Sequence, residues 1–209
     1  VMGTLCGVPV MVMQGRMHEY EGYTPEEVVY PIRVARLLGV ESLLVTNAAG
    51  AINESFSVGD LMLIRDHIRL MGSSPLKGLN LPEFGPRFCD MTTAYDPDFL
   101  VMAEKEGKKL GLPMREGNYF FFPGPQFETP AEIRAARALG GDAAGMSTVY
   151  EVTAAAHCGM RTLGISLMTN MAAGILKQKL SGEEVNRTAE AAREHFSALV
   201  RACLPLMAG

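Results

Sequence analysis

The chain has 209 residues, 48% of them hydrophobic and 20% charged, a composition typical of one folded domain of ordinary size. Its formal net charge of −4 argues against nucleic-acid and basic membrane-surface binding, since both need clustered lysine and arginine. No stretch has the length of a membrane span or the pattern of a signal peptide. The four cysteines are scattered without metal-ligand spacing, which favours reduced thiols, a cytoplasmic location and no metal site.

The N-terminal stretch VMGTLCGVPVMVMQG consists of two apolar runs joined by a glycine-containing turn, and it has no polar lead-in. This pattern is typical of a chain that enters in the middle of a sheet. We therefore expect further residues upstream of Val1, so that residues 1–209 form a single domain without its N-terminal segment.

Apolar runs of strand length recur along the chain, and helical patterns separate most of them. This alternation predicts the α/β class, with one mixed central β-sheet flanked by helices. The predicted strands are Val8 to Met13, Ser42 to Thr46, Leu61 to Ile64, Asn118 to Phe122 and Thr162 to Met168.

Three helix starts are marked by a hydroxyl residue three positions before a glutamate, at Thr24, Thr129 and Ser181. Proline follows Thr24 and Thr129 directly, where it suits the first helical position. Gly39 and Gly140 are placed to end the first two helices. The third pattern, from about Ser181 to Leu204, is amphipathic and predicts a helix that covers the sheet.

Residues 72–92 are rich in glycine and proline and follow neither helical nor strand periodicity. They predict a long loop, and loops of this length in compact domains are usually functional or disordered. Inside the first helical pattern, Pro31 predicts a kink or a late start.

Polar side chains gather where the predicted strands end, which is the edge at which open α/β sheets bind ligands. Each of these segments alone has a simpler explanation: asparagine suits turns, and an acidic residue suits a helix start. Their recurrence at one edge predicts a binding site. The segments are QGRMHEYEGY, TNAAGAIN, FFFPGPQFETP, DAAGMSTVYE and SLMTNMAAG.

The common motifs for phosphate-binding loops, nucleophile elbows and zinc proteases are absent from the sequence. Instead, six strings spread over nearly the whole chain resemble the nucleoside phosphorylase family, in particular its trimeric, low-molecular-mass purine nucleoside phosphorylases. The resemblance implies reversible phosphorolysis of purine nucleosides in a homotrimer, with phosphate as co-substrate and no metal or organic cofactor. The strings are QGRMHEYEGY, VTNAAG, GDLMLIRDHI, PGPQFETPAEIR, GMSTVYEV and TNMAAG.

The resemblance also implies roles for individual residues. Phosphate would be held by Arg16, His18 and Ser147, with backbone near Ala48, while Tyr20 would approach the ribose. A guanidinium fork suits phosphate oxygens, which makes the first assignment chemically sensible. The alternative for the arginine is a surface ion pair with one of the glutamates of the same segment, Glu19 or Glu21.

For the base, the resemblance implies a site formed by Phe127, Glu128, Met146 and Asn170. The carboxylate of Glu128 would accept the N1–H of a 6-oxopurine, and the Asn170 amide would donate to N7 or O6. With His18, these two residues would be the catalytic ones. Without the resemblance, the phenylalanine and the methionine would be assigned to the core, where such residues are usually buried.

The resemblance implies that two further positions lie at the ribose. Phe88 matches a family phenylalanine that covers the ribose of the neighbouring subunit's site. Gly182 stands where many family members have a histidine that contacts the 5′-hydroxyl.

A phosphate loop and a further phosphate-binding histidine that the family places upstream have no counterpart in residues 1–209. A weakly catalytic nucleoside-binding member of the family therefore stays open as an alternative. A second alternative is an enzyme like methylthioadenosine phosphorylase, which the resemblance gives the same fold but which binds a 6-aminopurine.

Overall fold

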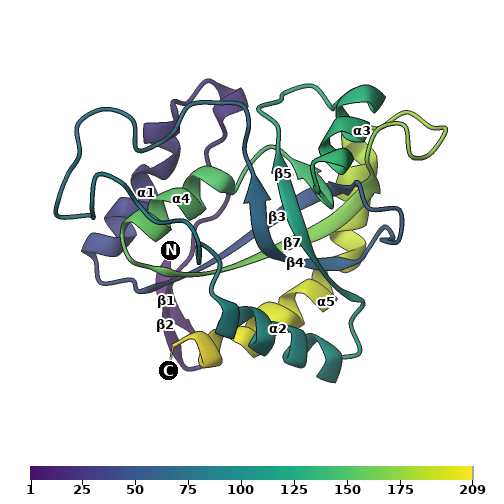
Figure 1. Ribbon diagram of the computed structural model, residues 1–209. Coiled ribbons are helices and arrows are strands. Elements are labelled where there is room, and N and C mark those ends of the chain that lie inside the picture. The colour runs from purple at the N-terminus through teal and green to yellow at the C-terminus, as the bar shows by residue number, and fades with distance from the viewer. Residues whose placement is uncertain (209) are drawn as a thin grey trace.

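The structure is a computed structural model and describes residues 1–208. After an N-terminal hairpin, strands and α-helices alternate along the chain except at one point, where two strands follow each other (Figure 1). In chain order the elements are β1 (Met2–Leu5), β2 (Val8–Met11), the short 3-10 helix η1 (Glu19–Glu21), α1 (Pro25–Leu37), β3 (Ser42–Ala51), β4 (Leu61–Ile68), α2 (Pro97–Lys109), β5 (Met114–Phe121), α3 (Pro130–Ala138), β6 (Ala143–Gly145), α4 (Val149–His157), β7 (Arg161–Met171) and α5 (Gly182–Met207).

The central sheet is mixed and closes into a barrel of five strands in the order β3, β6, β5, β4 and β7. Parallel pairs join β3 to β7, β4 to β5 and β5 to β6, while β3–β6 and β4–β7 are antiparallel. The predicted mixed sheet flanked by helices is confirmed. Its closure into a barrel was not predicted from the strand patterns.

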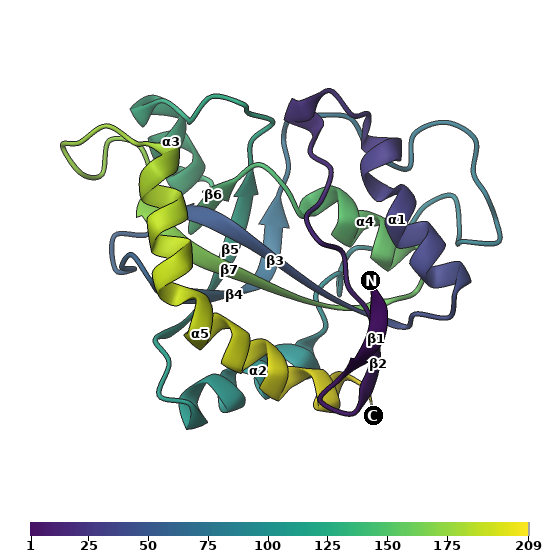
Figure 2. The same cartoon turned by 180° about the vertical axis from the view of Figure 1, so that it is seen from behind.

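Helices cover the barrel on two sides. Figures 1 and 2 show α1 and α4 together on one side and α2 with α5 along the other. Helix α1 contacts α4, and α2 contacts α5. The core follows this division. One cluster includes Val29, Met62 and Val152, and a second includes Leu63, Leu163 and Leu199 from α5. The amphipathic cover helix is thus confirmed, because α5 buries Leu199 and Cys203 against the strands.

The predicted helix ends are confirmed. The hydroxyl oxygens of Thr24 and Thr129 each accept a hydrogen bond from the backbone three residues on, and the glutamate there bonds back to complete a capping box. Gly39 and Gly140 have positive φ angles and donate to carbonyls of the preceding turn, the geometry of a Schellman stop. The late start suggested for the first helix is wrong, because α1 begins at Pro25 and contains Pro31.

The first strand differs from its prediction. Val8–Met11 pairs only with Met2–Leu5, in a two-stranded antiparallel sheet apart from the barrel, and the strand ends two residues early. Val12 and Met13 are exposed, so the apolar run before QGRMHEYEGY is not the buried strand that its composition indicates. It has no barrel strand beside it to bury its side chains.

Residues 72–92 form the predicted loop, without helix or strand. Within residues 1–208, no helix combines the length and the apolar character needed to cross a membrane. Across the same residues, no cluster of three His, Cys, Asp or Glu side chains is placed to hold a metal ion.

Candidate active site

Arg16 lies between β2 and η1, and its guanidinium reaches the start of α4. Nη1 donates to the Thr148 hydroxyl at 2.9 Å and lies 3.4 Å from the Glu151 carboxylate, while Nη2 donates to the Thr46 carbonyl. The ion pair suggested with Glu19 or Glu21 is wrong. A guanidinium has five N–H groups, so this anchoring leaves others free for a ligand.

Ser147 and Thr148 form the turn between β6 and α4. The Ser147 amide donates to the Tyr119 hydroxyl at 3.2 Å, and its own hydroxyl lies 3.1 Å from that of Thr148. Burial raises the pKa of Tyr119 to about 12, which keeps this hydroxyl neutral. The arginine and the serine of the predicted phosphate site are thus brought together through Thr148, a residue that the sequence did not single out.

The backbone of this turn is strained. Thr148 has φ 76° and ψ −46°, and the Val149 amide donates to the Ser147 carbonyl at 2.8 Å, which closes a γ-turn. Positive φ is rare for a β-branched residue and costs about 1–3 kcal/mol. Such strain persists where the surrounding structure demands it, and functional sites are where it clusters.

His18 and Tyr20 lie on the same short segment. Their rings stack with centroids 4.6 Å apart, and the His18 ring nitrogen Nδ1 is 3.3 Å from the Glu21 carboxylate. A hydrogen bond from the His18 amide to Glu21, the largest cause, lowers the pKa of that carboxyl. The segment presents an ordered imidazole and a half-exposed phenol beside Arg16.

Ala48 and Asn170 were expected just after strands, but both lie inside them. Strands β3 and β7 continue side by side past the predicted ends, with Ala48 paired to Leu167 and Gly50 to Asn170 across a bulge. They extend because each is the other's hydrogen-bonding partner. The asparagines in these two segments favour turns in the sequence, whereas pairing between β3 and β7 keeps the backbone there extended.

The Asn170 side chain is buried and partly satisfied. Its oxygen accepts from the Thr169 hydroxyl at 3.0 Å, and its nitrogen donates to the Met171 carbonyl at 3.0 Å. An amide nitrogen carries two protons, so one donor remains. The Asn170 amide packs closely against the backbone of β3, because a Cβ on Gly50 would lie 3.0 Å from its nitrogen.

Glu128 precedes α3, whose N-cap is Thr129, and it is half-buried. Burial raises the pKa of its carboxyl, with the nearby Glu132 adding to the shift. Phe127 beside it is 42% exposed, an apolar ring available to a ligand. The core alternative for this phenylalanine is therefore wrong.

Met146 and Tyr20 meet at Gly124, in the loop before Phe127. A side chain on Gly124 would collide with the Met146 sulfur and approach the Tyr20 ring. Gly124 has a positive φ of 69°, which glycine adopts without strain. Three of the predicted segments therefore converge at this glycine.

Phe88 lies elsewhere, in the long loop, with 90% of its surface exposed. It lines a cavity of about 400 Å³ together with His67, Arg69, Met91, Thr153 and others. The structure therefore does not bring Phe88 to Arg16 or Asn170 within one chain.

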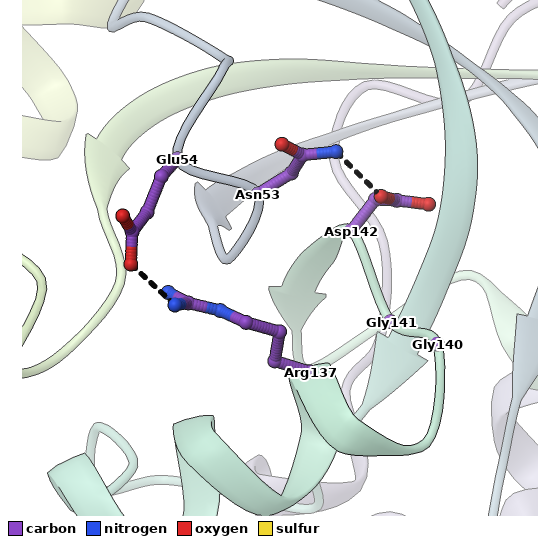
Figure 3. Close-up of a pocket in the computed structure, with 6 residues that line it drawn as sticks. All are labelled: Asn53, Glu54, Arg137, Gly140, Gly141 and Asp142. Carbon is purple, nitrogen blue, oxygen red and sulfur yellow. Dashed lines mark hydrogen bonds and ion pairs between the residues drawn. The ribbon is translucent and has the colours of Figure 1, made fainter.

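A second cavity, of about 340 Å³, was not predicted and lies where α3 meets β6 (Figure 3). Its polar side chains bond to one another: Arg137 pairs with Glu54, and Asn53 donates to Asp142 at 2.9 Å. Gly140 and Gly141 complete its wall. These mutual contacts tie α3 to the β3 end.

Three site residues were missed from the sequence: Thr148, Asn47 and Glu151. Asn47 donates to the Thr148 hydroxyl at 2.9 Å, and Glu151 is a buried carboxylate beside Arg16. Both motifs that contain them, VTNAAG and GMSTVYEV, were identified. Within each motif, no pattern of residues indicates which polar side chains meet.

The fold is of the α/β class, and its candidate site joins an arginine to the two hydroxyls at the start of α4. The chain belongs to the phosphorylase superfamily, whose family profile matches residues 1–205.

Within this superfamily, the chain is similar to purine nucleoside phosphorylases. The chain is 54% identical over 202 residues to purine nucleoside phosphorylase 1 of Bacillus subtilis, covering 97% of this chain and 74% of that one. A Schistosoma purine nucleoside phosphorylase solved with guanosine has a TM-score of 0.94 and 40% identity, covering 97% and 76% of the two chains. The Schistosoma mansoni enzyme solved with adenosine has a TM-score of 0.89 and 40% identity, with coverages of 96% and 76%.

Proposed function

We propose that this protein is a purine-nucleoside phosphorylase that cleaves inosine, guanosine and their 2′-deoxy forms to the free base and pentose 1-phosphate, in purine salvage. The observation that carries the proposal is the joining of Arg16 to Ser147 through Thr148. The similarity to purine nucleoside phosphorylases supports it. Phosphate is the co-substrate, and the assigned roles require no metal or organic cofactor.

Phosphate binding falls to Arg16, His18, Ser147 and the backbone at Ala48. The free N–H groups of the guanidinium and the serine hydroxyl supply donors to the phosphate oxygens. Ala48 is exposed at the β3 end, so its backbone can be approached. Phosphate held below the sugar also brings an anion to the cation that develops there.

Base binding falls to Glu128, Asn170 and Phe127. Breaking the glycosidic bond leaves negative charge on the purine, and the free Asn170 donor stabilises that charge more in the transition state than before it. Glu128 accepts from N1–H of a 6-oxopurine. An amide donor at position 170 suits a 6-oxo group better than a 6-amino group, which favours this function over a methylthioadenosine phosphorylase.

The ribose lies between Tyr20, Met146 and Phe88 of a neighbouring subunit. Phe88 is exposed and lines a cavity whose lining does not include Arg16, which supports a homotrimer whose sites are shared across the interface. A lone chain would leave this large ring without a partner surface.

The test is the rate of hypoxanthine release from inosine at increasing phosphate concentration. The proposal expects no release without phosphate and a saturable rise with it. Binding of inosine with no phosphate-dependent turnover would instead identify a nucleoside-binding protein. Adenosine binding alone discriminates little, since one relative has been solved with adenosine bound.

A further inference from the structure

The hydroxyl of Thr148 is a junction between three side chains. It accepts from Arg16 Nη1 and from Asn47 Nδ2, each at 2.9 Å, and it lies 3.1 Å from the Ser147 hydroxyl. The residue is fully buried at the start of α4. Its donors come from the segment after β2 and from β3, which are far apart in the sequence.

The directions of these hydrogen bonds follow from proton counting. A hydroxyl offers two lone pairs and one proton, and neither a guanidinium nor an amide nitrogen can accept. Both lone pairs of Thr148 are therefore occupied, and its proton must point to Ser147. The Ser147 hydroxyl accepts that proton and keeps its own for another acceptor.

We propose that Thr148 is a positioning residue for the phosphate co-substrate: it fixes Arg16 and directs the Ser147 proton toward the phosphate oxygens. This inference rests on the proposed function. It explains why a β-branched residue occupies a backbone position with φ 76°, where glycine would be relaxed. Here the hydroxyl is needed despite the backbone strain.

Three substitutions separate the hydroxyl from the backbone. Thr148→Val keeps the shape and removes the hydroxyl, Thr148→Ser keeps the hydroxyl, and Thr148→Gly removes both the hydroxyl and the strain. Thr162→Val is the matched control, because Thr162 is 1% exposed and its hydroxyl has no partner within residues 1–208.

Two readouts are needed: the KM for phosphate against the KM for inosine, and the dissociation constant of inorganic phosphate by calorimetry. The Val and Gly variants should weaken phosphate about tenfold or more in both readouts, with little change in the KM for inosine. The Ser variant should keep KM values and a phosphate dissociation constant close to those of the native protein. Thr162→Val should change none of these quantities.

Melting temperature separates this role from a folding role. The Gly variant loses the backbone strain but also leaves the Arg16 and Asn47 donors without their acceptor, so its melting temperature should stay within a few degrees of the native one while it binds phosphate poorly. Unchanged phosphate affinity in folded Gly or Val variants would overturn the inference, as would equal loss of affinity for phosphate and inosine. If the native protein binds phosphate without cleaving inosine, the proposed function fails while calorimetry still tests Thr148.

Discussion

Nη1 of Arg16 lies 3.4 Å from Oε1 of Glu151, and only 19% and 8% of the two side chains are exposed. This ion pair fastens the segment after β2 to helix α4. It gives the arginine a structural role beside the proposed binding role, and the two roles can be separated.

The single change Arg16→Met leaves the Glu151 carboxylate buried without its cation. We expect a loss of about 3 kcal/mol in the free energy of unfolding, together with loss of phosphate binding. The double change Arg16→Met with Glu151→Gln should recover most of the stability and none of the phosphate binding. Urea unfolding and phosphate calorimetry measure the two effects. Recovery of phosphate binding in the double variant would contradict the role of Arg16.

Base selectivity tests Glu128 and Asn170. Adenosine presents a lone pair at N1 to the carboxylate and an amino group to the amide donor, so two buried contacts become unfavourable. We expect kcat/KM for inosine to exceed that for adenosine by up to about 10⁴-fold. Asn170→Asp should narrow the gap, because a carboxylate accepts from the amino group. Similar kcat/KM values for both nucleosides in the native protein would show that this base site is wrongly assigned.

The pH dependence of base binding tests Glu128 alone. Burial raises the pKa of its carboxyl, so the side chain begins to protonate at a higher pH than an ordinary glutamate. The protonated form no longer accepts from N1–H with full strength. Hypoxanthine affinity without phosphate should therefore fall as the pH falls through this raised pKa. Glu128→Gln should bind more weakly and show no such fall; an acid limb of equal size in the variant would assign it to another group.

The shared site is tested at Phe88. Phe88→Ala should raise the KM for inosine severalfold and leave the melting temperature nearly unchanged, since the ring is 90% exposed and fills no core. Leu79→Ala is the matched control, a 91% exposed residue of the same loop, and should change neither quantity. A fully active monomer in sedimentation would refute the contribution of a second subunit.

The 5′-hydroxyl of the ribose is tested at Gly182. A Cβ there meets nothing within 4 Å, so the position has room for the first atom of a side chain. We expect 5′-deoxyinosine to keep most of the kcat/KM of inosine in the native protein, and Gly182→His to introduce a preference for the hydroxyl of about 2–10-fold. Gly182→Ala controls for the added Cβ. A strong native preference for inosine would mean that another residue holds the hydroxyl.

The local signals in the sequence predicted α1, α3 and α5, because capping is a short-range effect, whereas α2 and α4 were not predicted. The Thr24 and Thr129 caps and the Gly39 stop depend on neighbours within a few residues. The strands were harder. The three residues of β6 are too few to show a period, and β3 and β7 lengthen only because they pair with each other.

The sequence predicted which segments form the candidate site, but not which of their side chains contact one another. The sequence marked Arg16 and Ser147 through the family resemblance, and the structure joins them. It gave no indication that Thr148 lies between them, since hydroxyl residues are common before helices. Likewise, the sequence alone suggests that the Glu151 carboxylate faces solvent. It is buried because α4 packs against α1 and the barrel.

The most direct test of the account is ³¹P nuclear magnetic resonance of the purified protein with equimolar inosine and phosphate. Phosphorolysis predicts a new phosphate-ester resonance from ribose 1-phosphate, growing in step with hypoxanthine and absent with Arg16→Met. Hypoxanthine release without that resonance would mean that water, not phosphate, attacks the sugar, and would contradict the account.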